Sequence, residues 1–333
     1  MKGKGSLLFL PPFFPEAPMH YYLAKRLAFL VLTIIAASVL AFILLHAIPG
    51  GSAETIARHT LVGLEDSVSE EVLAQVSQQY NLADPLWQQY VSWLSEVIVR
   101  GNLGISFVYL DTPVTDLISL AIIPTLVLAA TSMLIVIVVG IPLGIYSAIH
   151  ENRPGDLVIR CATIISISFP SFWIALMLIL VFSLTLNLLP VTGYGAPANL
   201  VLPAVSLAIH PTAVVIRIVR TSMLETLGQQ YITFAIAKGL SFGSIVWNHA
   251  VRNALIPVVT LLGLYFGHLL AGTVIIENIF AWPGIGKLLV DGVFSHDIPV
   301  VTACIVVIVT LFLVVNLGVD LLYHFIDPRI HYE

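Results

Sequence analysis

One stretch of the chain carries basic and aromatic side chains between two long apolar runs. It is YITFAIAKGLSFGSIVWNHAVRNALIP, residues 231–257, and it holds Lys238, His249 and Arg252. A Gly-Leu-Ser break, 239–241, divides it, and no acidic residue occurs from 226 to 276. A basic insert of this kind, divided by a glycine, is unusual between apolar runs of such length.

The spacing within this stretch predicts two short helices. Residues 231–238 form the first, with Ile232, Ala235 and Ile236 as an apolar stripe. The Gly-Leu pair ends this helix, and the hydroxyl of Ser241 can cap the second. Such a bent pair suits insertion into the groove of a partner protein. An amphipathic helix lying on anionic lipid has the same pattern, and spacing alone does not separate the two.

Metal chemistry has no comparable signal. Imidazole is a good ligand for nickel, and it is offered by His46, His59, His210, His268 and His296. None of these makes an i, i+4 pair or a local cluster with Cys or Asp, so no metal site and no cofactor are predicted. Cys161 and Cys304 are expected to be packing residues, because a free cysteine is usually simply buried.

Catalytic motifs are missing from the sequence as well. An intramembrane enzyme would need paired carboxylates, a Ser/Lys pair or a His-rich metal motif, and none is present. A phosphate-binding loop of the form G-x-x-x-x-G-K-[ST] does not occur; WPGIGK, 282–287, lacks its first glycine and its final Ser/Thr. The chain is therefore not expected to be an enzyme. If ATP drives it, the nucleotide site is on another subunit, docked on the cytoplasmic side.

The elements that position these residues are membrane helices. The 333 residues are 58% hydrophobic and 10% charged, with far too little charge for a soluble surface. A helix needs about 20 apolar residues to cross a bilayer. The uncharged runs predict six spans, at 25–48, 118–149, 158–188, 201–224, 253–276 and 298–322. Within them two small-residue ladders, one of Gly140, Gly144 and Ala148 and one of Gly263, Gly267 and Ala271, favour close helix packing.

The basic residues set the orientation. Eleven of the fourteen lysines and arginines fall on the side that holds both termini, 150–160 and 225–252. The other side holds twelve of the nineteen acids. The positive-inside rule therefore predicts that both termini and the basic stretch are cytoplasmic. The net charge of −5 comes mainly from the outer face, and no nucleic-acid partner is expected.

Two segments lie outside this core. Residues 1–18 are interrupted by prolines and are expected to be a disordered extension or a start placed too early, because Met19 precedes two cations and the first span (19–49). Residues 50–116 predict a small external cap of two helices, over 68–82 and 85–98. The remainder, 117–333, is expected to be a five-helix core that contains the cytoplasmic loop 225–252.

The basic stretch resembles the coupling loop of bacterial binding-protein-dependent ABC importers, whose signature is E-A-A, three residues, then glycine. Ala235 and Gly239 match its last alanine and its glycine. Segments 237–241 and 249–257 are similar to the dipeptide/oligopeptide/nickel branch of that family. Fragments in the same order along the chain carry the same resemblance, at 19–32, 102–107, 189–195, 277–300 and 327–330. ENIFAWPG and LPVTGYG are most similar to the first permease subunit of the nickel-importing members.

This resemblance implies a type I permease of six helices in the bacterial inner membrane. Its partners would be a second related permease, two ATP-binding subunits and an extracytoplasmic solute-binding protein. The resemblance places five residues in the groove of an ATP-binding subunit: Ala235, Lys238, Gly239, Leu240 and Phe242. His210 and His268, the two histidines deep in the spans, are candidates for the transport pathway, although a lone histidine is more often a hydrogen-bonded packing residue.

The last external loop, 277–297, is expected to serve partly as a gate and partly as a docking surface for the binding protein. The residues expected to act there are Glu277, Trp282, Pro283, Gly284 and Asp291, with Asp297 as a further rim charge. A loop that merely packs over the mouth of the pathway has a similar prior.

Several alternatives stay open. The cargo is nickel, as ion or chelate, or a di- or oligopeptide, and the sequence excludes neither. A stand-alone channel or secondary transporter is disfavoured, because the centres of the spans hold no Asp, Glu, Lys or Arg and the basic loop suits a partner.

Overall fold

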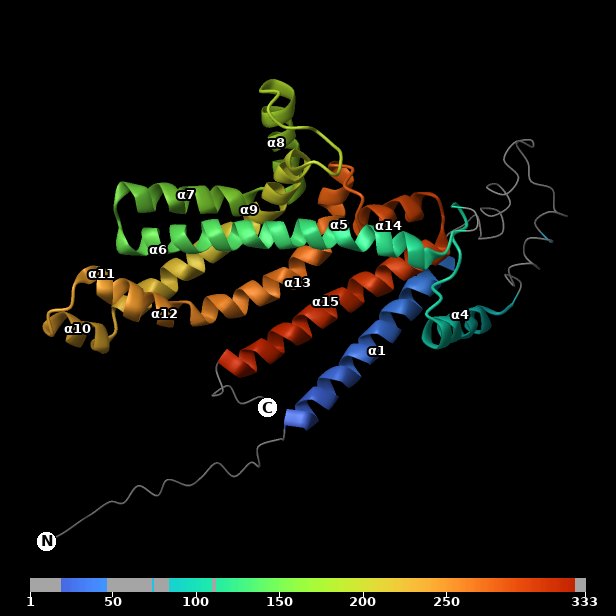
Figure 1. The fold of residues 1–333 in the computed structure, drawn as a ribbon, viewed down its shortest axis with the longest axis horizontal. Coiled ribbons are helices and arrows are strands. Elements are labelled where there is room, and N and C mark those ends of the chain that lie inside the picture. Colours follow the sequence, from blue (N-terminus) through green and yellow to red (C-terminus); the bar gives the residue numbers. More distant parts are fainter. Residues whose placement is uncertain (1–18, 47–73, 75–83, 110–111, 327–333) are drawn as a thin grey trace, which may run out of the picture.

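The computed structural model describes residues 19–46, 74, 84–109 and 112–326. Nearly all of these residues are helical, and the one extended pairing among them is an isolated bridge between Ile105 and Pro113. Figure 1 shows an elongated bundle in which the long helices run between two ends. The all-α membrane architecture expected from composition is confirmed.

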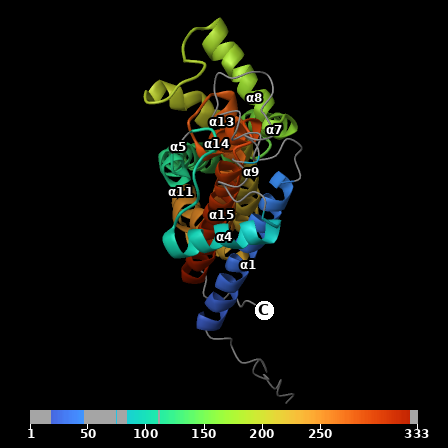
Figure 2. The same ribbon diagram turned by 90° about the vertical axis from the view of Figure 1, so that its right-hand side faces the viewer.

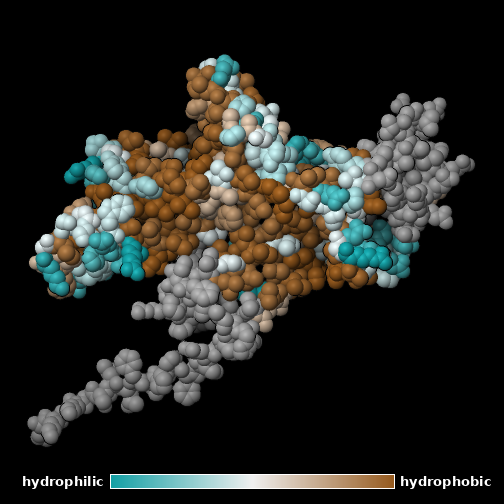
Figure 3. All heavy atoms as spheres, viewed as in Figure 1, coloured by the Kyte–Doolittle hydropathy of each residue, from teal (hydrophilic) through white to brown (hydrophobic). Residues whose placement is uncertain are grey.

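Five segments are long and apolar enough to cross a membrane. Four are the single helices α1 (Met19–His46), α9 (Pro197–Leu227), α13 (Ile256–Ile279) and α15 (Ile298–Ile326). The fifth is continuous and consists of α5 (Val114–Ile135), the π-helical segment η1 (Val136–Gly140) and α6 (Ile141–Ile149). Each overlaps a span expected from the sequence. Figure 3 shows the resulting apolar belt, with hydrophilic residues concentrated at the two ends of the bundle.

The expected third span, 158–188, is not one straight helix. α7 (Pro154–Ser168) is followed by α8 (Ser171–Leu178) and its π-helical continuation η2 (Ile179–Thr185). The helix formed by α8 and η2 is bent from α7 by 108°. Phe169 is extended, with φ −102° and ψ 140°, and Pro170 follows it. A residue before proline avoids the α conformation, and proline has no N–H to continue the helix. The segment expected as the third span is therefore a bent helix pair, which makes a sixth crossing only if both parts form one broken span, and α8 projects from the bundle (Figure 1).

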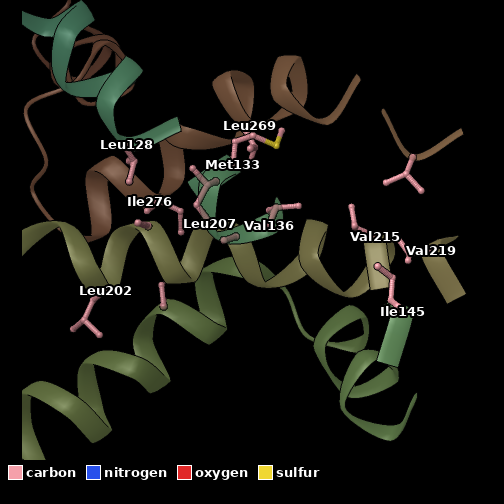
Figure 4. Close-up of a cluster of buried hydrophobic side chains, with 14 of the residues drawn as sticks. Leu128, Met133, Val136, Ile145, Leu202, Leu207, Val215, Val219, Leu269 and Ile276 are labelled. Atoms are coloured by element: carbon pink, nitrogen blue, oxygen red, sulfur yellow. The ribbon is translucent and has the colours of Figure 1, made fainter. Parts of the chain in front are cut away.

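The first small-residue ladder packs within the subunit. A Cβ on Gly140 would lie 3.0 Å from Cγ1 of Val215, and a Cβ on Gly144 would lie 2.6 Å from Cβ of Val219. Both valines are on α9 and are fully buried, in the cluster drawn in Figure 4. The absence of side chains at the two glycines lets the α5–α6 span approach α9 closely, which dispersion contacts then stabilise.

The second ladder has mixed surroundings. A Cβ on Gly267 would lie 3.2 Å from the ring of Phe312, and one on Gly263 would overlap the side chain of Val319. These two glycines therefore seat α13 against α15. The third member, Ala271, is exposed and takes no part in that contact.

The two ends of the bundle carry different short helices (Figure 1). One end holds α10 (Gln230–Ala237), α11 (Phe242–Ser244) and α12 (Val251–Ala254), near the turn between α6 and α7. The opposite end holds α4 (Leu86–Arg100) and α14 (Ile285–Phe294). We call them the hairpin end and the α14 end.

Helix α4 lies across the outer part of α1, as Figure 2 shows. The hydroxyl of Tyr90 is 2.8 Å from Oγ of Ser38, and its ring meets Phe42 edge-on at 5.6 Å. The helix expected over 85–98 is thus present. The other expected helix of the cap, over 68–82, falls outside the described residues except for residue 74, and so does the N-terminal extension, residues 1–18. The complete two-helix cap therefore stays a prediction.

Candidate functional site

The hairpin end is built around a glycine turn. Helix α10 ends where Gly239 takes a φ of +80°, a conformation that favours glycine. The N–H of Gly239 donates to the carbonyl of Ile236 at 2.9 Å, and the N–H of Leu240 donates to that of Ala235 at 3.3 Å. This pair of bonds is a Schellman motif, which satisfies carbonyls at the helix end. Ser241 then caps α11, because its Oγ accepts from the N–H of Ser244 at 3.4 Å.

The inner face of this hairpin is a small apolar core. Ile232 and Ala235 of α10 pack with Ile245, and all three are buried. The hydroxyl of Tyr231 accepts from Nδ2 of Asn253 at 2.8 Å and so joins α10 to α12. These contacts close residues 230–254 into one unit, which we call the coupling hairpin.

The expected apolar stripe on α10 is correct for Ile232 and Ala235 and wrong for Ile236. Ile236 is 60% exposed, since successive helical residues are rotated by about 100° and it falls away from the hairpin core. It is instead exposed, as are several neighbouring residues around the hairpin turn. We use the term tip surface for these exposed residues, which are Phe234, Ile236, Lys238, Leu240 and Phe242.

The five residues expected to contact an ATP-binding subunit divide between these two faces. Lys238, Gly239, Leu240 and Phe242 are exposed, and the phenyl ring of Phe242 is 60% exposed. Ala235 is buried inside the hairpin, so its side chain supports the fold of the tip and is not presented on it. Phe234 and Trp247, at 68% and 65% exposure, were not singled out. The sequence feature that could have identified both residues is a large apolar side chain within a segment expected to be a loop.

A buried ion pair beside the hairpin was also missed. Asp156, at the start of α7, is completely buried and receives a bidentate contact from Arg220 of α9, at 2.9 Å from Nε and 3.0 Å from the terminal nitrogen. The Ser147 hydroxyl and the N–H of Asn152 also donate to this carboxylate. The network therefore joins α6, α7 and α9. Sequence gave no sign of it, because the two charges are 64 positions apart.

At the α14 end, Glu277 is an anchor within the fold and not a rim charge. It is completely buried near the end of α13. Its carboxylate accepts from the hydroxyl of Thr125 at 2.7 Å, from the N–H of Gly286 at 2.7 Å and from the N–H of Lys287 at 3.1 Å. The last two donors are in the first turn of α14, where free N–H groups favour an anion. A Cβ at Gly284 would overlap this carboxylate, so glycine is required there.

Trp282 is likewise an internal anchor. It is 2% exposed, its indole N–H donates to the carbonyl of Pro124 at 2.9 Å, and its ring meets Tyr194 edge-on at 4.9 Å. Of the expected outer-loop residues, Pro283 is exposed, and Asp291 is partly exposed and pairs with Lys287 at 2.7 Å. Only these two have side chains available at the surface.

Asp297 is also misassigned as a rim charge. It is 1% exposed, and it accepts from the Ser106 hydroxyl and from the N–H groups of Phe107 and Val108. It precedes α15 and thereby fastens the 102–107 segment to the junction of α14 and α15. Both corrections have the same reason: a carboxylate close to a helix end or start can accept hydrogen bonds from backbone N–H groups that would otherwise be buried without a partner.

The two candidate pathway histidines are both exposed, on different helices. His210 is on α9; His268 is on α13, with its ring 6.1 Å from that of Phe312 and 6.3 Å from that of Tyr265. The described part of the chain brings no three metal-ligating side chains together. The role of the two histidines in the pathway stays a prediction.

Comparison with known families decides what these features belong to. Residues 140–332 match the family described as binding-protein-dependent transport system inner membrane component. Residues 19–115 match the N-terminal part of the corresponding membrane components. The chain belongs to this family. It is an integral inner-membrane permease subunit of an ABC importer.

Relatives of this permease subunit match over almost its whole length. The glutathione transport system permease protein GsiC of Escherichia coli O6:H1 is 40% identical over 315 residues, which are 95% of this chain and all of the relative. GsiC of E. coli K12 and of Shigella dysenteriae serotype 1 are each 39% identical over the same shares. The resemblance to the peptide/nickel branch is thereby confirmed.

Solved structures agree on the fold. The methionine ABC transporter MetNI, in an inward-facing conformation, matches with a TM-score of 0.56 at 18% identity, covering 64% of this chain and 97% of that one. A second crystal form of the same transporter gives 0.54 at 19% identity, over 63% and 96%. The type I importer permease fold is therefore shown. In this family ATP-binding and substrate-binding components are separate partners, and the permease component is not itself catalytic.

Proposed function

We propose that this permease carries small peptides across the inner membrane and is driven by ATP-binding subunits that dock on the tip surface of the coupling hairpin. The cargo is proposed from the relatives, since permeases named for transport of glutathione, a tripeptide, align over 95% of the chain. Nickel rests on a few sequence fragments and has no comparable support. It stays an alternative outcome of the experiment below.

The observation that carries the coupling mechanism is the exposure of large apolar side chains on a rigid hairpin. Phe234 and Phe242 are 68% and 60% exposed, and Lys238 and Leu240, which lie between them in the sequence, are exposed as well. Exposed apolar groups of this size mark an interaction site. The hairpin holds them with the Schellman turn and the Tyr231–Asn253 bond, so little ordering is needed on docking.

A movement of the coupling hairpin would be transmitted to two spans, α13 and α9. Helix α12 leads directly into α13, with Leu255 between them, while Arg220 of α9 is held by the buried Asp156 of α7. The hairpin end of α9 is thus tied to α7 by the ion pair and to η1 and α6 by the glycine contacts. We propose that approach of two ATP-binding subunits moves these helices as a unit.

The assembly follows from the same family assignment. It would contain this chain, a second related permease, two ATP-binding subunits and an extracytoplasmic binding protein. The positive-inside rule puts the hairpin end in the cytoplasm and the α14 end outside, where the binding protein would meet Pro283 and Asp291. Both termini would then be cytoplasmic.

The test is transport by cells with and without this chain. Radiolabelled glutathione and radiolabelled nickel at trace concentration are offered separately, each with an excess of a dipeptide mixture as competitor. We expect deletion to abolish glutathione uptake, competitor peptides to reduce it in intact cells, and nickel uptake to be unchanged. Loss of nickel uptake that peptides do not affect would replace the peptide cargo with nickel. Uptake by this chain without ATP-binding subunits would overturn the coupling mechanism.

A further inference from the structure

Helix α4 has more apolar surface than its contact with α1 covers. Tyr90 and Trp93 are partly buried on the side that faces the bundle. A second stripe, which we call the outer stripe, consists of Trp87, Val91 and Ile98, and these are 65%, 55% and 73% exposed. Their spacings of four and seven residues place them on one side of the helix. The described part of the chain therefore leaves an apolar side of α4 uncovered.

The remaining side of α4 is polar. Gln88 and Ser92 are exposed, and Glu96 pairs with Arg100 at 2.9 Å. Because successive helical residues are rotated by about 100°, these four side chains share one continuous arc, in which Val99 is the exception. A helix divided in this way between an apolar and a polar side is typical of helices that lie in the plane of a membrane surface.

The contacts with α1 give the depth of α4. The apolar span of α1 covers Ala24–Ile43. Tyr90 reaches Ser38 at 2.8 Å and Phe42 ring to ring at 5.6 Å, and both partners are inside that span. Ser38 lies five residues before the end of the span, about 7–8 Å along the axis. Interfacial helices insert their apolar side about 5–10 Å into the boundary between headgroups and acyl chains, so the depth of α4 agrees with that position.

The direction of α4 agrees as well. Figure 2, viewed along the long axis of the bundle, shows α4 running across the direction of the spans and not along it. Leu40 and Ile43, at the same end of α1, are 59% and 53% exposed, so the membrane-facing surface of that span reaches the level of α4. Trp87 begins the outer stripe, and tryptophan is enriched at membrane interfaces because its ring is apolar while its N–H can meet water or headgroups.

We propose that α4 lies in the surface of the phospholipid leaflet at the α14 end, with the outer stripe in the lipid and the polar side in water. The same helix would fix the height of the neighbouring external segment, because the indole N–H of Trp93 donates to the carbonyl of Leu103 at 3.3 Å. Asp297 holds the N–H groups of Phe107 and Val108 from the other side. The external loops are thereby referenced to the bilayer. This role is independent of the cargo.

The experiment measures the surroundings of single positions on α4. The complete transporter is reconstituted without binding protein in vesicles of phosphatidylethanolamine and phosphatidylglycerol. A nitroxide spin label is attached at Val91→Cys or Ile98→Cys in the outer stripe. The matched controls are Gln88→Cys and Ser92→Cys on the polar side. Relaxation of the label by oxygen, which concentrates in lipid, is compared with relaxation by chromium oxalate, which stays in water.

Labelling is confined to the introduced cysteine. The background carries Cys161→Ser, because Cys161 is exposed, whereas Cys304 is fully buried. The other subunits are used without reactive cysteines. Co-purification of all subunits verifies the assembly of each labelled variant, and two positions on each side keep the comparison available if one variant does not fold.

We expect the ratio of oxygen to chromium oxalate relaxation to be several-fold higher at positions 91 and 98 than at 88 and 92, and to stay so when binding protein is added. High exposure to chromium oxalate at all four positions would overturn the proposal and place α4 in water above the membrane. Shielding of positions 91 and 98 from both reagents would also overturn it, and would assign the outer stripe to a contact with protein, such as the second permease.

Discussion

The hydroxyl of Thr125 on α5 donates to the carboxylate of Glu277 on α13 at 2.7 Å, although 152 positions separate them. The same hydroxyl oxygen accepts the N–H of Ile285 at 2.8 Å, in the first turn of α14. One carboxylate and one hydroxyl thus join two spans and the short helix between α13 and α15. At the α14 end these hydrogen bonds join α5, α13 and α14 at one buried point.

Replacing Glu277 by Ala should loosen this end. The change leaves the N–H groups of Gly286 and Lys287 and the Thr125 hydroxyl without their acceptor, at about 1–3 kcal/mol for each unsatisfied group. We expect a clear fall in the melting temperature of the purified transporter. Asp291→Asn is the control, because its pair with Lys287 is partly exposed and contributes about 1 kcal/mol or less. Equal melting temperatures for both variants would contradict the anchoring role.

Gly239→Asp should abolish uptake while leaving the protein in the membrane. The positive φ strains any residue with a Cβ by about 1–2 kcal/mol, and a carboxylate adds negative charge at the tip surface. Gly243→Ala is the matched control, since Gly243 has a helical neighbourhood and open space around it. Uptake and membrane abundance are measured together. Normal uptake by Gly239→Asp would falsify the coupling assignment.

Phe242→Asp should weaken capture of the ATP-binding subunits. A buried aromatic anchor at an interface typically contributes 2 kcal/mol or more, on the order of a 30-fold loss in affinity. The control is Phe294→Asp, which changes an equally large exposed ring, 81% exposed, at the opposite end of the bundle. Co-purification of the ATP-binding subunits reports the result. Similar losses from both variants would argue against docking at the tip surface.

Arg220→Ala should destabilise the hairpin end strongly. It leaves the buried carboxylate of Asp156 without its bidentate partner, and such unpaired buried charges cost about 3–5 kcal/mol. The double variant Asp156→Asn with Arg220→Ala should recover part of that loss, because the unpaired charge is gone. Thermal unfolding of the single and double variants gives the coupling energy. Additive effects would show that the two residues act independently.

Local sequence patterns were sufficient to predict much of the structure of this protein. The apolar runs determined five spans to within a few residues, because a helix in lipid must satisfy its own backbone and be long enough to cross. The Gly-Leu-Ser break determined the hairpin turn, since glycine conformation and serine capping depend on neighbouring residues. The family was also readable, because its motifs are short and contiguous.

Only the tertiary structure decided which polar residues face inward. Glu277 and Asp297 were expected to be rim charges of an external loop, yet both are buried, because their carboxylates accept hydrogen bonds from the hydroxyls of Thr125 and Ser106, which are distant in sequence. Trp282 is buried as well, because its indole N–H donates to the carbonyl of Pro124. The Asp156–Arg220 pair likewise joins residues that are 64 positions apart. Helical periodicity gives the face on which a side chain lies, but not which helix packs against that face. That depends on how the spans assemble, and the assembly is set by contacts such as those of Gly144 with Val219.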